Sequence, residues 1–258
     1  MNKDFIKKQN FIKELNVIQH ITLWLTVFLS LSLFIIQLCI VKNAYKHWTT
    51  WCTCLATIGS VFSVMAGVKK RALCPLLGVI TSIVLLAIAW DSQLYGSMIM
   101  YGVNIVVQAV SLITWIKGSD NKGMIKPKKL TWWVVILYIL VFVGLTALFT
   151  WMEGQKWFYS FWSKQGDKLP LAVRIFDAGT LMFTVATFLP MIKKYDWVWY
   201  VYIIEDICIC LTWLLKICLI QSSTQEVLQG ITMIVSALSM TATCILGIFN
   251  WKSNKKSR

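Results

Sequence analysis

Residues 131–152 have the sequence TWWVVILYILVFVGLTALFTWM, a run without a single charged side chain. A helix of about 20 apolar residues crosses the hydrocarbon core of a bilayer. Tryptophan favours the two membrane interfaces, and it stands near both ends of this run. The segment therefore predicts a transmembrane helix.

Seven further apolar blocks surround this one, near residues 18–41, 48–68, 72–90, 94–116, 174–192, 197–220 and 227–250. Pro75 interrupts one block, and the block at 197–220 contains charged residues. Over the whole chain only 14% of residues are charged, against roughly 25% in a soluble domain. We predict an all-α integral membrane protein with about eight transmembrane helices.

The net charge of +14 lies in short basic clusters between the blocks. Eight spans place both termini on one side, and 18 lysines and arginines fall on that side against six on the other. Cytoplasmic loops are enriched in these residues, so we expect both termini in the cytoplasm. Because topology explains the clusters, we expect no nucleic-acid partner.

The polar stretch 117–131 divides the chain into two halves. We expect a cytoplasmic tail at 1–17, an additional first helix at 18–41 and a three-helix group at 48–116. A loop and linker helix at 117–152, a second three-helix group at 174–251 and a basic tail at 252–258 follow. Both groups start outside and end inside, which favours parallel repeats of the kind known in transporters.

Span 94–116 carries a stripe of polar and aromatic residues, namely Tyr101, Asn104, Gln108, Ser111 and Trp115. Their spacing of i, i+3, i+7, i+10 and i+14 puts them on one helix face. Amides in hydrocarbon need partners, so this face meets protein or water. Hydrogen bonding between helices is one explanation. A substrate path is the other, and we favour it.

Span 197–220 carries Trp199, Tyr202 and Asp206 at i, i+3 and i+7. A planar cationic ring stacks well on aromatic faces. The Asp206 carboxylate would then accept hydroxyl groups or offset the positive charge. Alternatively, Trp199 anchors the helix at the interface and Asp206 pairs within the bundle. Asp177, early in span 174–192, is a further intramembrane acid and a candidate binding residue.

The cysteines and histidines do not suggest a metal or a cofactor. The eight cysteines contain no CxxC pair, and His20 and His47 are far apart in the sequence. Cysteine is also a common buried residue. We therefore expect no metal site and no cofactor.

These motifs resemble the PnuC family of bacterial vitamin transporters, over about residues 48–251. In the first half Gly78, Gln93, Leu94, Tyr95 and Trp115 match the family pattern, whereas Gln108, Ser111 and Leu112 replace its Asn, Gly and Trp. In the second half the residues that fit without gaps are Asp177, Lys193, Lys194, Tyr195, Trp199, Asp206, Gly247 and Trp251. Tyr202 stands where the family has the second Trp of a Trp-x-x-Trp motif.

The resemblance implies a 3+1+3 helix arrangement like that of the SWEET sugar transporters, with one added N-terminal helix. It implies facilitated uptake through a bacterial inner membrane, a midplane site around Trp199, and retention of the substrate by phosphorylation. Nicotinamide riboside is the leading substrate, and thiamine, riboflavin and deoxynucleosides are alternatives. We expect a homo-oligomer.

An intramembrane enzyme with Glu205 and Asp206 as acid and base is the competing hypothesis. No metal-ligand set and no pair of nucleophile and base accompanies these two residues in the sequence. We therefore expect a transporter and no enzymatic activity.

Overall fold

The computed structural model describes residues 11–41, 44–46, 48–91, 95–120, 124–129, 131–157, 170–219 and 224–253. Gln93, Leu94, most of the predicted N-terminal tail and the last five residues lie outside these ranges. The helices are α2 (Val17–Ile40), α3 (Trp48–Val68), α4 (Leu73–Asp91), α5 (Tyr95–Lys117), α6 (Trp132–Glu153), α8 (Leu171–Ala186), α9 (Phe188–Lys193), α10 (Val198–Leu219) and α11 (Thr224–Ser253). Two short 3-10 turns, Ile12–Glu14 and Ala44–Lys46, flank α2.

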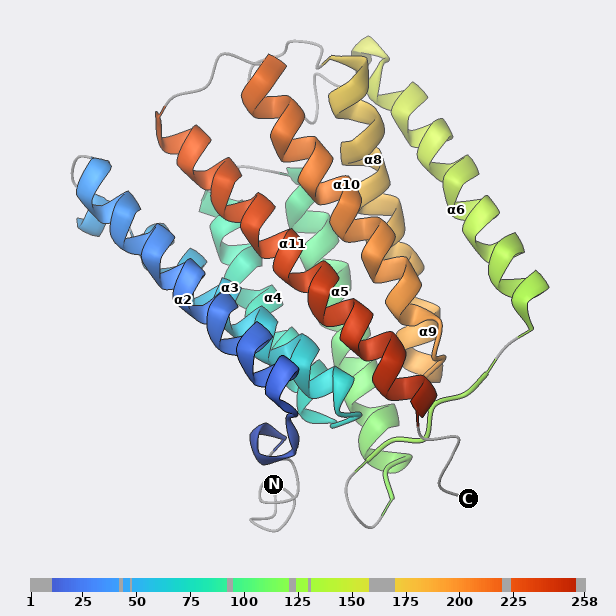
Figure 1. Cartoon of the computed structure of the whole chain (residues 1–258). Helices are drawn as coiled ribbons and strands as arrows, with labels where there is room; N and C mark the ends of the chain where they lie inside the picture. The colour runs from blue at the N-terminus through green and yellow to red at the C-terminus, as the bar shows by residue number, and fades with distance from the viewer. Residues whose placement is uncertain are drawn as a thin grey trace.

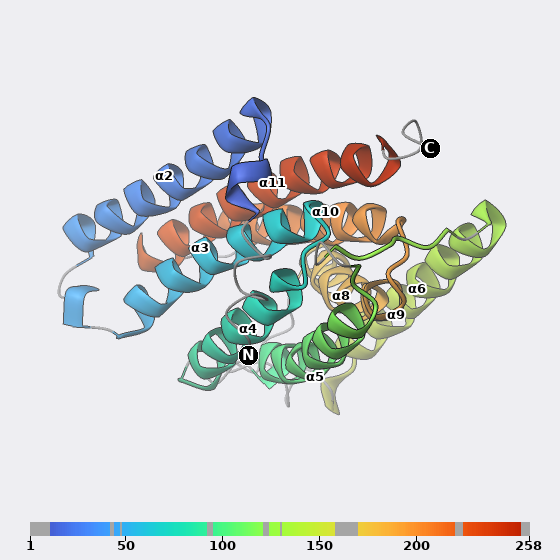
Figure 2. The same ribbon diagram turned by 90° about the horizontal axis from the view of Figure 1, so that it is seen from below.

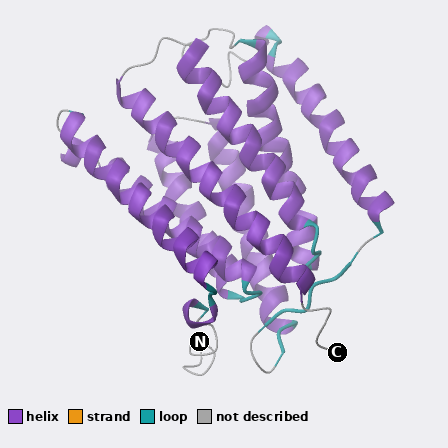
Figure 3. Ribbon diagram, in the orientation of Figure 1, coloured by secondary structure: helices purple, strands orange, loops and turns teal. Residues whose placement is uncertain are grey.

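The prediction of an all-helical membrane protein is confirmed, and within the described ranges each predicted block is a helix (Figure 3). Six segments are long and apolar enough to cross a membrane: Val17–Ile40, Thr50–Val68, Met100–Lys117, Trp132–Glu153, Leu171–Lys193 and Gly230–Trp251. Of the other two helices, α4 offers a shorter apolar segment, Leu73–Ala87, and α10 contains Glu205, Asp206 and Lys216. Large apolar side chains point outward, and Trp133 is 81% exposed. Lipid is the solvent that such a surface requires.

The two prolines within predicted spans have different effects: the helix that contains Pro75 is continuous, and the span that contains Pro190 is broken. Pro75 lies in the first turn of α4, where the missing N–H has no intrahelical partner to lose. Pro190 lies further along its span, and it cannot donate to the carbonyl of Ala186. The hydroxyl of Tyr138 on α6 donates to that carbonyl instead, at 2.8 Å. The predicted span 174–192 is therefore two helices, α8 and α9, meeting at Thr187.

The helices form one bundle in which α4 and α10 hold corresponding places. Helix α4 packs against α3 and α5, and α10 packs against α8 and α11. The contacts of α3 with α11 and of α5 with α9 join the two groups. Helix α2 lies on α3 and α11, whereas α6 packs along α8 at the edge of the bundle (Figures 1 and 2).

The turns after α3 and α9 have the same backbone structure. Lys70 and Lys194 are both left-handed, with φ of 60° and 64°. The N–H groups of Lys70 and Arg71 donate to Gly67 and Ala66, at 2.8 and 3.0 Å. Those of Lys194 and Tyr195 donate to Met191 and Pro190, at 3.3 and 2.8 Å. Both are Schellman caps with lysine at the position where glycine is usual.

The segment 124–129 connects these two turns at one end of the bundle (Figure 1). The N–H of Ile125 donates to the carbonyl of Lys70 at 3.0 Å, and the N–H of Lys128 donates to the carbonyl of Lys194 at 2.8 Å. Burial lowers the pKa of Lys70 and of Lys194, and Lys128 lowers that of Lys194 further. A side-chain pair of Glu14 and Arg71 ties the start of the described chain to the same end.

Two tryptophans, one from each helix group, donate the indole N–H to a backbone carbonyl of the other group. The indole N–H of Trp115, at the end of α5, donates to the carbonyl of Met191 on α9 at 2.9 Å. The indole N–H of Trp251, at the end of α11, donates to the carbonyl of Gly67 on α3 at 3.1 Å. Both indoles are buried, at 1% and 6% exposure. Each bond therefore fastens the last helix of one group to the first helix of the other.

We predict that Trp115→Phe and Trp251→Phe each lower the thermal stability of the purified protein. Each change removes one indole N–H and its hydrogen bond, at a cost of about 0.5–1.5 kcal/mol, while the carbonyl keeps the backbone N–H of Lys194 or Lys70. Thermal unfolding in detergent measures the effect, with the exposed Trp133→Phe as the control. Melting temperatures equal to that of the control would show that these hydrogen bonds do not hold the groups together.

Candidate functional site

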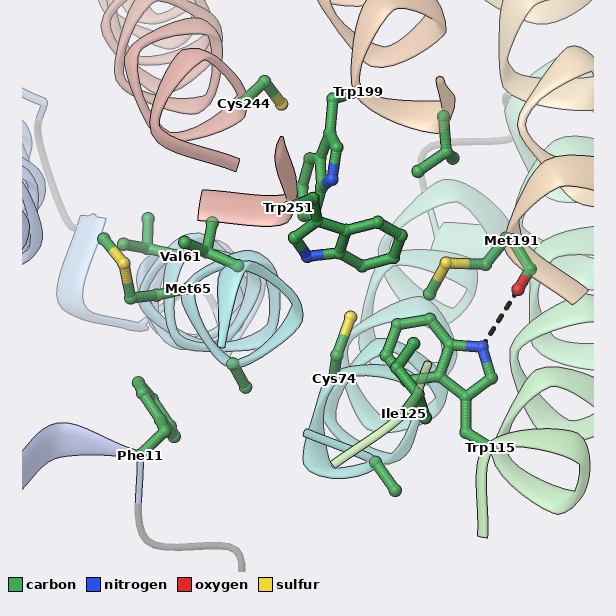
Figure 4. Packing of buried hydrophobic residues seen from close by; sticks show 14 of the residues in the cluster. Phe11, Val61, Met65, Cys74, Trp115, Ile125, Met191, Trp199, Cys244 and Trp251 are labelled. Carbon is green, nitrogen blue, oxygen red and sulfur yellow. Dashed lines mark hydrogen bonds between the residues drawn. The ribbon is translucent and has the colours of Figure 1, made fainter. Parts of the chain in front are cut away.

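Trp199 belongs to the larger of the two clusters of buried apolar side chains among the described residues (Figure 4). It lies in the first turn of α10 and is 3% exposed. A Cβ atom on Gly247 of α11 would lie 2.6 Å from Cδ2 of this indole, and one on Gly67 of α3 would lie 3.3 Å from its Cη2. The edge of the indole also meets the ring of Trp251, with centroids 5.2 Å apart. Only glycine at these two positions leaves room for the ring.

Tyr202 continues the aromatic face of α10 by one turn. Its ring centroid is 6.2 Å from that of Trp199, with the planes tilted by 48°. Cys74 of α4, Cys244 of α11 and Glu205 lie close enough to act on its hydroxyl electrostatically, and Thr187 hydrogen bonds to it. Tyr202 therefore stands where helices of both groups come together.

Two carboxyl groups follow Tyr202, and they differ in their partners. Asp206 is 7% exposed, and the thiol of Cys244 donates to its Oδ2 at 3.9 Å. Thr241 on the same helix, α11, contacts this carboxyl group as well. Glu205 accepts a hydrogen bond from Thr184 of α8 at 2.7 Å through Oε1, but its buried Oε2 has no partner. Asp206 is thus satisfied within the bundle, whereas Glu205 is satisfied at one oxygen only.

The polar stripe of α5 faces protein, as predicted. Asn104 donates to the hydroxyl of Ser82 on α4 at 2.9 Å, and Gln108 donates to Asn104 at 3.4 Å. A Cβ atom on Gly78 would lie 2.8 Å from the Gln108 side chain, so α4 and α5 are in close contact here. Tyr101, on the next turn, is near enough to Glu205 for their charges to interact.

Four buried polar atoms on these two helices have no hydrogen-bond partner. They are Oε1 of Gln108 and Oγ of Ser111 on α5, and Nε1 of Trp199 and Oε2 of Glu205 on α10. Nearly all buried polar atoms in folded proteins are paired. These unpaired donors and acceptors, one set on a helix of each group, are free to form hydrogen bonds with a polar ligand. The arrangement suits reversible binding of a small aromatic molecule.

Two further predicted site residues have different surroundings. Trp115 belongs to the same buried cluster as Trp199 and lies beside Trp251, with ring centroids 6.4 Å apart (Figure 4). Asp177 on α8 belongs to a charged group with Glu153, Arg174 and Lys216, near the end of the bundle opposite the turns. Whether either residue touches a substrate stays a prediction.

Sequence reasoning left Glu205 out of the candidate list. The available signal was a carboxyl group in an apolar helix, which usually marks function in membrane proteins. The i, i+3, i+7 spacing favoured Asp206 instead. Only the contact with Thr184 shows that Glu205 also points into the bundle. Among the described residues, no three His, Cys, Asp or Glu side chains are grouped as metal ligands.

The fold and the sequence were each compared with known proteins. The fold matches a crystal structure of the vitamin B3 transporter PnuC with a TM-score of 0.70 and 16% sequence identity, over 98% of this chain and 97% of that one. No curated protein sequence matches the chain. Residues 50–253 match the family model described as nicotinamide mononucleotide transporter. Because this match covers most of the sequence, the chain belongs to the nicotinamide mononucleotide transporter family, whose known activity is transport and not catalysis.

Proposed function

We propose that this protein mediates facilitated uptake of nicotinamide riboside, or of a related nucleoside-like vitamin, through a bacterial cell membrane. The observation that carries the proposal is the set of unpaired polar atoms and aromatic faces on α5 and α10, enclosed by helices of both groups. Membership of a transporter family supports it. The solved structure that matches this fold is described as that of a vitamin B3 transporter.

The chemistry of the enclosed groups suits a nucleoside with a planar base. Trp199 and Tyr202 offer aromatic faces for the base. Asp206, Asn104 and Gln108 offer acceptors and donors for hydroxyl and carboxamide groups. Tyr101 adds a hydroxyl group near Glu205.

The charges favour a nucleoside over a nucleotide. Glu205 and Asp206 are adjacent acids, and within the described residues no lysine or arginine lies within 4 Å of either. Lys216 is eleven residues along the helix from Glu205, roughly 16 Å away. A phosphate group would be repelled here and would find no cation, so the substrate in this proposal carries none.

We also propose that α3–α5 and α8–α11 are parallel repeats around the linker α6, the 3+1+3 arrangement. Three pairs of observations support it: the two middle helices α4 and α10, the two lysine Schellman caps, and the two indole–carbonyl bonds. In this scheme the linker is 117–152, the groups are 48–116 and 174–251, and α2 is the additional helix.

The tryptophan cluster suggests how the repeats control access. Trp115, Trp199 and Trp251 fill the contact between the repeats at the end that holds the basic turns (Figure 4). Release at this end would require the bonds of Trp115 to Met191 and of Trp251 to Gly67 to open as one repeat rocks against the other. At the opposite end, Asp177 would attract a cationic substrate before it binds.

Orientation follows from the same basic turns. The start of α2, the end of α11, the segment 124–129 and the turns at Lys70 and Lys194 lie at one end of the bundle (Figure 1). Basic residues favour the cytoplasmic side, so we propose that this end and both termini are cytoplasmic. The homo-oligomer expected from the sequence stays a prediction.

Counterflow in liposomes that contain only this protein tests the proposed function. Labelled nicotinamide riboside should exchange with unlabelled substrate and should be recovered intact. Thiamine, riboflavin and a deoxynucleoside, offered as competitors, rank the alternative substrates. Chemical conversion of the label would instead support the enzyme hypothesis, and no exchange of any of these compounds would reject the proposal.

We predict that Trp199→Phe weakens substrate binding by about 1 kcal/mol or more, because phenylalanine has a weaker π-face and lacks the unpaired indole N–H. Phenylalanine keeps most of the packing, so the protein should remain folded. Calorimetric titration of the purified protein measures the affinity. Trp133→Phe, on a side chain that is 81% exposed, is the matched control. Unchanged affinity in Trp199→Phe would remove this residue from the site.

We predict that Gly247→Ala also weakens substrate binding, although residue 247 itself supplies no polar group. The added methyl group would lie 2.6 Å from the Trp199 indole and would force the ring to move, an overpacking that costs about 1–3 kcal/mol. Gly144→Ala on α6 is the control, since its methyl group meets nothing within 4 Å. Equal affinities in the two variants would mean that the position of Trp199 does not matter for binding.

A further inference from the structure

Among the described residues near the centre of the bundle, Glu205 is the acid that has one carboxyl oxygen without a hydrogen-bond partner. Its Oε1 is held by the hydroxyl of Thr184, at 2.7 Å, and this bond fixes the carboxyl group between α10 and α8. Its Oε2 is buried and has no hydrogen-bond partner. The neighbouring Asp206 differs, because Cys244 and Thr241 of α11 already occupy its carboxyl group.

Glu205 also lies beside the aromatic face of α10. Trp199, Tyr202 and Glu205 follow one another at intervals of three residues, so each is about one turn from the next. Glu205 acts electrostatically on the hydroxyls of both Tyr202 and Tyr101. A ring bound against Tyr202 would therefore have this carboxyl group about one helical turn away.

In the part of the chain that the structure describes, this charge has no cation beside it. Within the described residues no lysine or arginine comes within 4 Å of Glu205 or Asp206. The cations Arg174 and Lys216 act on Glu153, near the other end of α6 and α10. An unbalanced carboxylate inside a membrane protein is costly, and a bound cation would reduce that cost.

We infer that Glu205 determines the charge of the transported molecule, and that it selects an aromatic ring with a permanent positive charge. This inference rests on the proposed transport function and narrows it. Pyridinium and thiazolium rings belong to the selected class, whereas riboflavin and deoxynucleosides, which are neutral, do not. The Asp206 carboxyl group, which Cys244 and Thr241 occupy, does not take part in this selection by charge.

Two forms of one ligand separate charge from shape. Nicotinamide riboside has a cationic pyridinium ring, and its reduced dihydropyridine form is neutral and nearly the same size. Calorimetric titration of both forms gives the affinity ratio for each protein. The wild type should bind the cation at least tenfold more tightly. Glu205→Gln should reduce this preference to less than threefold, mainly through weaker binding of the cation.

Four further variants test whether the effect is specific to the charge of Glu205. Asp206→Asn keeps an acceptor oxygen and should weaken both forms by the same factor, leaving the ratio as in the wild type. Glu153→Gln removes one acid near the far end of the bundle and should leave both affinities unchanged. If Glu205→Gln does not fold, Glu205→Met supplies a second neutral side chain of similar volume, and Glu205→Asp should retain the preference.

The outcomes distinguish this inference from the proposed function. If the wild type binds the cation and Trp199→Phe weakens it, but Glu205→Gln keeps the tenfold ratio, the role of Glu205 is rejected and the transporter stands. Equal losses of both forms in Glu205→Gln would likewise reject charge selection in favour of hydrogen bonding. If the wild type binds neither form, and no thiamine, the proposed function itself fails.

Discussion

A bilayer offers no hydrogen bonds, and this constraint governs the whole molecule. The backbone polar groups of a span must find their partners in the protein, so each span is helical, and many of its side-chain hydroxyls bond back to the preceding turn. Thr22, Thr26 and Ser30 on α2 do so in succession. Where the backbone cannot close its own bonds, a side chain takes over. Tyr138 serves the carbonyl that Pro190 leaves open.

The same constraint explains how the two helix groups are joined. A helix end has carbonyl groups without intrahelical partners. Gly67 and Met191 lie near such ends, and each carbonyl accepts a backbone N–H of its own turn and also an indole N–H from the other group. The segment 124–129 satisfies two more carbonyls, those of Lys70 and Lys194, with its own N–H groups. The groups are therefore joined at the basic end by a few directional bonds, which a conformational change can break one at a time.

The sequence was sufficient to predict the helices, because apolar runs and their flanking charges are local properties. It also gave the correct face for Asn104 and Gln108, since helical periodicity fixes which residues share a side. The break in the sixth span was not predicted. Pro190 was visible, but its effect depends on the carbonyl of Ala186 and on a partner from α6.

The roles of the two central acids could not be predicted from spacing. Glu205 and Asp206 are neighbours, so they point about 100° apart on the helix. Which one contacts α8 and which one contacts α11 depends on the neighbours that tertiary packing supplies. The role of Gly247 could not be predicted from the sequence for the same reason. Its lack of a side chain makes room for Trp199. A glycine that serves a partner on another helix leaves no pattern in its own segment.

In the proposed function, Trp199 would link binding to the packing between the groups. Its indole is wedged between Gly67 of the first group and Gly247 of the second, and Gly67 also accepts the bond from Trp251. A ring that stacks on Trp199 must therefore act on the contact that closes the basic end. A carrier needs such a connection, because a site that merely binds tightly would hold its substrate. Here the aromatic residue that would contact the substrate is also one that separates or joins the two halves.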